Sequence, residues 1–145
     1  MKITLNQLRA LIKEELEAAD KQPGWEELEN RLLQIDGKEV SRQYEEDMAK
    51  LLSRGKVWPA KKTVVMAGDP SRCHANVANL YDSNEGRAGI VTGWALGPND
   101  GIWRQHSWLW WPPKKQLVET TLKRDAYFGF ELTKSEADQF SFENY

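Results

Sequence analysis

The chain has 145 residues, a formal net charge of −2 at pH 7 and a single cysteine. This length suits one domain with a core large enough to fold without disulfide bonds, and a single cysteine excludes a disulfide framework and a four-cysteine zinc site. The near-neutral charge argues against a dedicated nucleic-acid binder, and without a long apolar run or a signal-peptide pattern we expect a cytoplasmic protein with no membrane partner and no cofactor.

The first predicted helix lies within residues 1–20. Thr4 and Gln7 form a capping box at its start, and apolar residues recur along it at helical spacing, at Leu5, Leu8, Ile12 and Leu16. This segment resembles N-terminal peptides common on phage-encoded proteins, including capsid-targeting peptides. The resemblance implies a helix that either docks on the domain or is detachable, and a protein that acts in the cytoplasm of a bacterial host.

Residues 24–62 are rich in charge and are predicted to be a helical region. One helix has an apolar face formed by Trp25, Leu28, Leu32 and Ile35, and Gly37 can end it. The next has Val40, Tyr44, Met48 and Leu51 on one face and ends at Gly55. Each helix has one apolar and one charged face, so we expect both to pack on the core of a single domain spanning residues 1–145.

Residues 63–145 hold most of the aromatic residues and are predicted to combine a helix with an antiparallel sheet. Strands are expected over 63–66, 89–96, 102–111, 116–120 and 126–132. The main helix of this part begins after Ser71 as its N-cap, and Thr133 with Glu136 forms a capping box for a last short helix. This order indicates an α+β fold, with the N-terminal helices packed on a cysteine-bearing helix and its sheet.

Cys73 lies in the first turn of its predicted helix, where the helix dipole and free backbone N–H groups favour an anion. A thiolate is the nucleophilic form of cysteine, and helix N-termini lower the pKa of thiols. The alternative is a small buried hydrophobic residue, because Cys73 shares the apolar face of the helix with Val77 and Leu80.

His106 and Glu119 lie on consecutive predicted strands joined at Pro112 and Pro113. If this corner joins the strands symmetrically, the two residues are directly opposed and point to the same face. A carboxylate in that position would orient the imidazole and stabilise its charged form. The alternatives are a packed histidine and a solvated carboxylate, and a slip of one residue would place the pair on opposite faces.

Residues 63–132 resemble the transglutaminase-like branch of the papain-like cysteine enzymes. Members carry a cysteine at the start of a helix, then a strand with a His-small-Trp pattern, then an acid followed closely by threonine. The matching residues here are Cys73, His106-Ser107-Trp108 and Glu119-Thr120-Thr121. The family usually has aspartate followed by proline and threonine as the third element, so Glu119 is a longer acid than the pattern has. The family often has an aromatic residue before the cysteine, where this chain has Arg72.

The resemblance implies a Cys73–His106–Glu119 triad that cleaves or transfers acyl groups through a thioester. Cys73 would attack the carbonyl of a peptide, protein or small amide substrate, and His106 would protonate the departing amine. Water as acceptor would give hydrolysis, and an amine would give transfer. The backbone N–H of Cys73 would form an oxyanion hole together with the side chain of Asn76 or Gln105.

Aromatic and basic residues suggest a groove near the triad. Its expected members are Trp94, Trp108, Trp110, Arg72 and Arg104. The alternative function is therefore a papain-like binding module that uses this groove without chemistry. A zinc site of Cys73, His106 and Glu119 is a further alternative, although the chain contains no metal-binding motif such as CxxC or HExxH.

Overall fold

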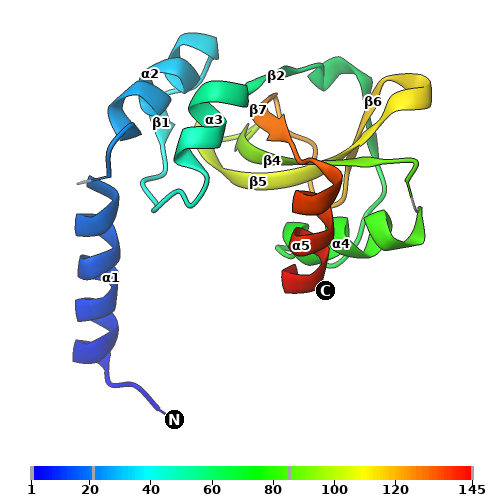
Figure 1. Ribbon diagram of the computed structural model, residues 1–145. Helices are drawn as coiled ribbons and strands as arrows, with labels where there is room; N and C mark the ends of the chain where they lie inside the picture. Colours follow the sequence, from blue (N-terminus) through cyan, green and yellow to red (C-terminus); the bar gives the residue numbers. More distant parts are fainter. Residues whose placement is uncertain (1, 21, 85, 145) are drawn as a thin grey trace.

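The computed structural model describes residues 2–20, 22–84 and 86–144, apart from the side chains of residues 15–20. It has an α+β architecture in which helices flank a curled, seven-stranded sheet (Figure 1). The helices are α1 (Leu5–Asp20), α2 (Trp25–Ile35), α3 (Met48–Arg54), α4 (Cys73–Ser83) and α5 (Lys134–Asn144), with short 3-10 turns η1 (Ala60–Lys62) and η2 (Pro112–Lys114). The strands are β1 (Glu39–Val40), β2 (Lys56–Trp58), β3 (Thr63–Val65), β4 (Gly89–Leu96), β5 (Ile102–Trp111), β6 (Gln116–Glu119) and β7 (Ala126–Glu131).

The hairpin of β4 and β5 forms the centre of the sheet. The strands follow the order β2-β7-β4-β5-β6-β3, and β1 pairs separately with β5. The β4–β5 pairing runs antiparallel from Gly89 opposite Trp110 to Leu96 opposite Trp103. The predicted bounds of both strands are confirmed, because two runs rich in β-branched and aromatic residues flank the Gly97–Gly101 turn.

The prediction of a purely antiparallel sheet is wrong, because β1 and β3 are parallel to their partners β5 and β6. β1 replaces the start of the predicted third helix, and only Met48–Arg54 is helical there. Val40 is buried beside Trp103 in a strand pair, so tertiary packing overrides the helical spacing of the apolar residues.

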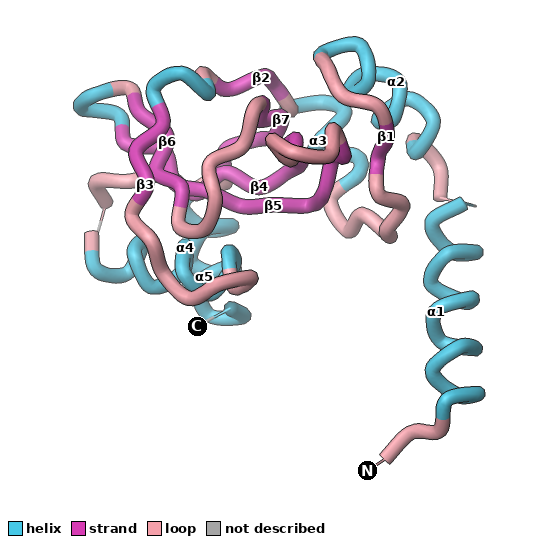
Figure 2. The backbone as a smooth tube through the Cα atoms, turned by 180° about the vertical axis from the view of Figure 1, so that it is seen from behind, coloured by secondary structure: helices cyan, strands magenta, loops and turns pink. Residues whose placement is uncertain are grey.

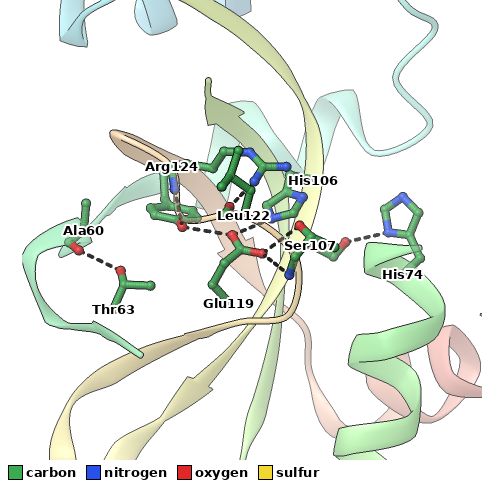
Figure 3. A network of polar contacts seen from close by, with 10 residues as sticks. Ala60, Thr63, His74, His106, Ser107, Glu119, Leu122 and Arg124 are labelled. Carbon is green, nitrogen blue, oxygen red and sulfur yellow. Dashed lines mark hydrogen bonds and ion pairs between the residues drawn. The ribbon is translucent and has the colours of Figure 1, made fainter. Parts of the chain in front are cut away.

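The edge of β5 that faces away from β4 is only partly covered. β1 pairs with Ile102 and Trp103, and β6 pairs with Leu109, Trp110 and Trp111. Between them, no strand of the described ranges pairs with this edge of β5 around His106, whose partner Gly93 lies on the opposite edge. The first turn of α4 lies against this part of the sheet, which Figure 3 shows from close by.

Helices cover one face of the sheet, and the curl of the sheet encloses the other. Figures 1 and 2 show α2 and α3 at one end and α4 and α5 at the other. The first pair packs on Trp94, Trp103 and Phe128, and the second on Ile90 and Leu109. The enclosed face holds a second aromatic core, formed by Trp58, Val91, Ala95, Trp108, Leu117 and Tyr127.

The helix α1 stands clear of the rest of the molecule in both views (Figures 1 and 2). Its capping box is confirmed, since the backbone N–H groups of Thr4 and Gln7 donate to each other's side chains. Its large apolar side chains at Leu5, Leu8, Leu11 and Ile12 are 42 to 62 % exposed, so they are not packed on the core. Leu16 lies outside the described side chains. In the described part of the chain no helix is long and apolar enough to cross a membrane.

Candidate active site

Cys73 is the first residue of α4 and is half-buried. The expected N-cap at Ser71 is wrong by one residue: Arg72 occupies the cap position, and Ser71 takes a left-handed conformation with φ of 58°. The loop is held instead by Asn76, whose side-chain oxygen accepts from the N–H of Asp69 and whose amide donates to the carbonyl of Asp69. This clamp fixes the chain that leads into Cys73.

His106 and Glu119 form a buried pair on the enclosed side of the sheet. His106 Nε2 lies 2.7 Å from Glu119 Oε1 (Figure 3). The side chains are 3 % and 0 % exposed, so water does not compete for the contact. Because Nε2 is engaged with the carboxylate, the other ring nitrogen, Nδ1, is left to face the Cys73 thiol.

The strand register that brings the pair together differs from the prediction. Leu109 lies opposite Val118 and not opposite Gln116, so β6 is shifted by two residues. The cause is the corner, where η2 is followed by Lys115 in a left-handed conformation and the loop is longer than a symmetric tight turn. A shift of two residues keeps Glu119 on the face of His106, and the glutamate reaches the imidazole diagonally.

The carboxylate of Glu119 accepts four hydrogen bonds. Oε1 accepts from His106 and from the hydroxyl of Tyr127 at 2.9 Å. Oε2 accepts from the backbone N–H and the hydroxyl of Thr121 at 3.0 and 3.1 Å. A carboxylate with this many donors stays ionised when buried. Burial alone would raise the pKa of Glu119, but the bonds with His106, Thr121 and Tyr127 lower it below 4.5.

The same contacts shift the pKa values of the cysteine and the histidine toward an ion pair. Burial alone would raise the pKa of the Cys73 thiol, but hydrogen bonds with His106 and His74 lower it from 9.0 to about 5. Burial would lower the pKa of His106, but its bonds with Cys73 and Glu119 raise it above 6.5. Both shifts favour the thiolate–imidazolium form of the pair, which is the reactive form of a cysteine nucleophile.

A second imidazole, that of the next residue His74, also lowers the pKa of the Cys73 thiol. Its Nδ1 lies 2.8 Å from Ser107 Oγ, which in turn lies 3.0 Å from Thr92 Oγ1. The ring also packs edge-on against Phe140 of α5. The sequence analysis assigned no role to His74, because its position beside Cys73 on the helix gives no signal of this contact with β5.

The side chains expected to complete the oxyanion hole are engaged elsewhere. Both polar atoms of the Asn76 amide bind the backbone of Asp69. The amide of Gln105 donates to the carbonyl of Tyr44 at 2.9 Å. Neither amide is free to turn toward Cys73 without losing a bond.

The expected aromatic groove is wrong, because Trp94 and Trp108 are fully buried. Trp94 lies in the core and donates to Glu45, and Trp110 packs against Trp58. The two arginines are exposed and form ion pairs on the surface, Arg72 with Asp69 and Arg104 with Asp100. The binding-module alternative therefore loses the surface on which it depended.

A different cleft, of about 650 Å³, lies beside the two histidines. It runs between the segment that leads into α3 and the helix α5, over the middle of β4 and β5. His74, Thr92 and His106 are among its lining residues, and so are five acids and one lysine: Glu45, Glu46, Asp47, Glu136, Glu143 and Lys50. Burial is the main cause that raises the pKa of Asp47, with a smaller contribution from Glu46 and Glu136, while Lys50 and Arg54 oppose the shift.

The described side chains contain no group of three His, Cys, Asp or Glu residues arranged to hold a metal ion. The zinc alternative therefore has no support in the geometry. Comparisons with family models, with curated proteins and with solved structures found no match.

Proposed function

We propose that the protein is a cysteine-dependent hydrolase or acyltransferase that acts on an amide, peptide or isopeptide bond. The observation that carries the proposal is the buried pair of His106 and Glu119, 2.7 Å apart, whose imidazole also lowers the pKa of the Cys73 thiol at the start of α4. A nucleophile, a base and a group that orients the base are the three parts that nucleophilic acyl transfer requires. A cysteine that only filled space would need neither partner.

The reaction follows from the roles of these groups. The thiolate of Cys73 attacks the carbonyl carbon and forms an S–C bond, and the charge moves to the carbonyl oxygen. When the carbonyl re-forms, the C–N bond breaks and the imidazolium of His106 gives its proton to the departing amine. Water or a second amine then attacks the thioester carbon and gives its proton to His106, and the C–S bond breaks to release the Cys73 thiolate.

The arrangement of the elements supports a papain-like reading of the fold. A helix carries the cysteine at its first residue, and neighbouring antiparallel strands of one curled sheet carry the histidine and the acid. In this reading Glu119 replaces the shorter aspartate of the transglutaminase-like pattern. The acidic cleft favours substrates with a positive charge near the reacting bond, because its carboxylates outnumber its cations.

The test is the pH dependence of Cys73 alkylation by iodoacetamide, followed by intact mass. Cys73 is the sole cysteine, so Cys73→Ala gives a clean blank. We expect the rate to rise with an apparent pKa of about 5, in place of the ordinary 9.0. His106→Ala should raise this apparent pKa, the low-pH limb of the alkylation profile, by more than one unit, because the imidazolium no longer stabilises the thiolate.

A wild-type thiol that reacts only as an ordinary thiol would contradict the proposal. If Cys73 alkylation shows the low apparent pKa, the substrate class can be tested with chromogenic peptide amides. One peptide carries lysine next to the amide and the other carries glutamate. We expect the lysine peptide to have the lower KM, and equal KM values would remove the charge preference.

A further inference from the structure

We infer that His74 supplies the second hydrogen-bond donor of the oxyanion hole, with its ring Nε2–H pointing toward the reacting carbonyl. The inference rests on the proposed acyl chemistry of Cys73 and assigns a role that neither Asn76 nor Gln105 fills. It is carried by a chain of three side chains from different elements: Thr92 of β4, Ser107 of β5 and His74 of α4.

The first donor of such a site is already present. Cys73 is the first residue of α4, where backbone N–H groups have no acceptor within the helix. A carbonyl carbon bound to Sγ places its oxygen near this N–H. A second donor must come from a side chain that lies close to the sulfur, and His106 is committed to proton transfer.

His74 meets this need by position. It follows Cys73 in the chain and lowers the pKa of its thiol, it lines the cleft, and both Ser107 and Phe140 fix the orientation of its ring. Ser107 is fully buried, so the bond to Nδ1 is shielded from water.

The hydrogen-bond chain also sets the tautomer. A thiolate can only accept, so the ring nitrogen of His74 that faces Cys73 carries a proton, and this nitrogen is Nε2 because Nδ1 faces Ser107. With the proton on Nε2, Nδ1 can accept a hydrogen bond from a hydroxyl. Ser107 donates to Nδ1, and its oxygen accepts from the hydroxyl of Thr92.

In the resting protein this Nε2–H stabilises the thiolate. When Sγ bonds to the carbonyl carbon, the negative charge moves from sulfur to the carbonyl oxygen, and the same donor follows the charge. His74 keeps its proton throughout, whereas His106 transfers one. Removing a single donor of this kind typically costs about 10²- to 10³-fold in rate.

The experiment measures acylation and alkylation side by side. The acylation probe is p-nitrophenyl acetate, with the burst of nitrophenolate as the signal and Cys73→Ala as the background. The alkylation probe is iodoacetamide at a pH where the thiol of each variant is fully ionised. Alkylation forms no oxyanion, so it reports the thiolate alone.

We expect His74→Leu to slow acylation by about 10²-fold or more and to change the alkylation rate of the ionised thiol by less than about threefold. His74→Gln retains an N–H donor and should recover acylation to within about tenfold of wild type. Circular dichroism establishes that each variant is folded. Should His74→Leu fail to fold, the glutamine variant and Ser107→Ala carry the comparison.

Three results overturn the inference. Acylation of His74→Leu at the wild-type rate means that the donor lies elsewhere. Equal losses of acylation and of alkylation at full ionisation mean that His74 only shapes the thiol. His74→Gln that is as slow as His74→Leu means that a donor at this position is not sufficient. In each case a low alkylation limb and a burst in wild type leave the proposed function standing, whereas their absence removes both.

Discussion

The two imidazoles that flank Cys73 are held in opposite ways. His106 lies on the enclosed side of the sheet and faces a carboxylate that accepts four hydrogen bonds. His74 lies on the helix-covered side and faces the hydroxyls of Ser107 and Thr92. One thiol therefore sits between a carboxylate-bound ring and a hydroxyl-bound ring.

The difference teaches how the same side chain acquires two roles. A carboxylate next to an imidazole favours the charged form, and the pKa of His106 is raised accordingly. A hydroxyl adds no charge and only orients the ring. The carboxylate side is thus suited to hold and release a proton, and the hydroxyl side to donate a fixed hydrogen bond.

Glu119→Gln should have the largest effect on this contrast. An amide in this position has no charge, and its NH₂ group must face either His106 or the donors of Thr121. We expect acylation of p-nitrophenyl acetate to slow by about 10²- to 10⁴-fold, as for orienting carboxylates elsewhere. The alkylation limb of Cys73 should also move upward from about 5, because His106 loses the partner that favours its charged form.

Glu131→Gln is the matched control for this change, since Glu131 is an exposed carboxylate at the end of β7. It should leave both rates unchanged. If Glu119→Gln acylates as fast as this control in a sensitive assay, the orienting role belongs to another residue and the contrast between the two sides disappears.

The pairing of His106 with Glu119 could be predicted from the sequence only in part. Side chains alternate between the two faces of a sheet, so the sequence positions place His106 and Glu119 on one face. A register error of two residues leaves them on the same face. The size of the shift depends on the left-handed Lys115 after Pro112-Pro113, which residue types alone do not specify. The longer acid fits a diagonal contact, which a direct pairing would not have required.

The elements with strong local signals could be predicted well, including the β4–β5 hairpin and the capping boxes at Thr4 and Thr133. The two-residue strand β1 could not, because its pairing with β5 is a tertiary contact between distant segments. The same reason hid the contact of His74 with Ser107, which joins residues 33 positions apart.

Ser107→Ala should have an intermediate effect, on the hydroxyl side alone. The change removes the partner of His74 Nδ1 and frees the ring to adopt the other tautomer. We expect acylation to slow by about tenfold, a loss comparable to one neutral hydrogen bond, while the alkylation limb moves by less than one unit. Ser83→Ala, at the exposed end of α4, is the control. If Ser107→Ala shifts the apparent pKa of Cys73 alkylation as much as Glu119→Gln does, the carboxylate side and the hydroxyl side are not independent.

Tyr127→Phe should have the smallest effect, at the outer edge of the carboxylate side. The hydroxyl donates to Glu119 and accepts from the N–H of Arg124, and the ring packs on Trp108. Phenylalanine keeps the ring, so the free energy of unfolding should fall by about 1 to 2 kcal/mol for the lost hydrogen bonds, as measured by urea denaturation. Glu119 retains three donors, so acylation should slow only a few-fold.

Tyr81→Phe is the matched control for that change, because its hydroxyl donates to Asp138 on the surface, where a hydrogen bond contributes little. Comparing the loss of unfolding free energy with the loss of acylation rate distinguishes a structural role of Tyr127 from a role in the reaction. A stability loss with nearly normal acylation identifies Tyr127 as a residue that holds the carboxylate in place. A loss of acylation as large as in Glu119→Gln would mean that this hydroxyl is needed to keep Glu119 charged, and the carboxylate side would then include Tyr127 as a positioning residue.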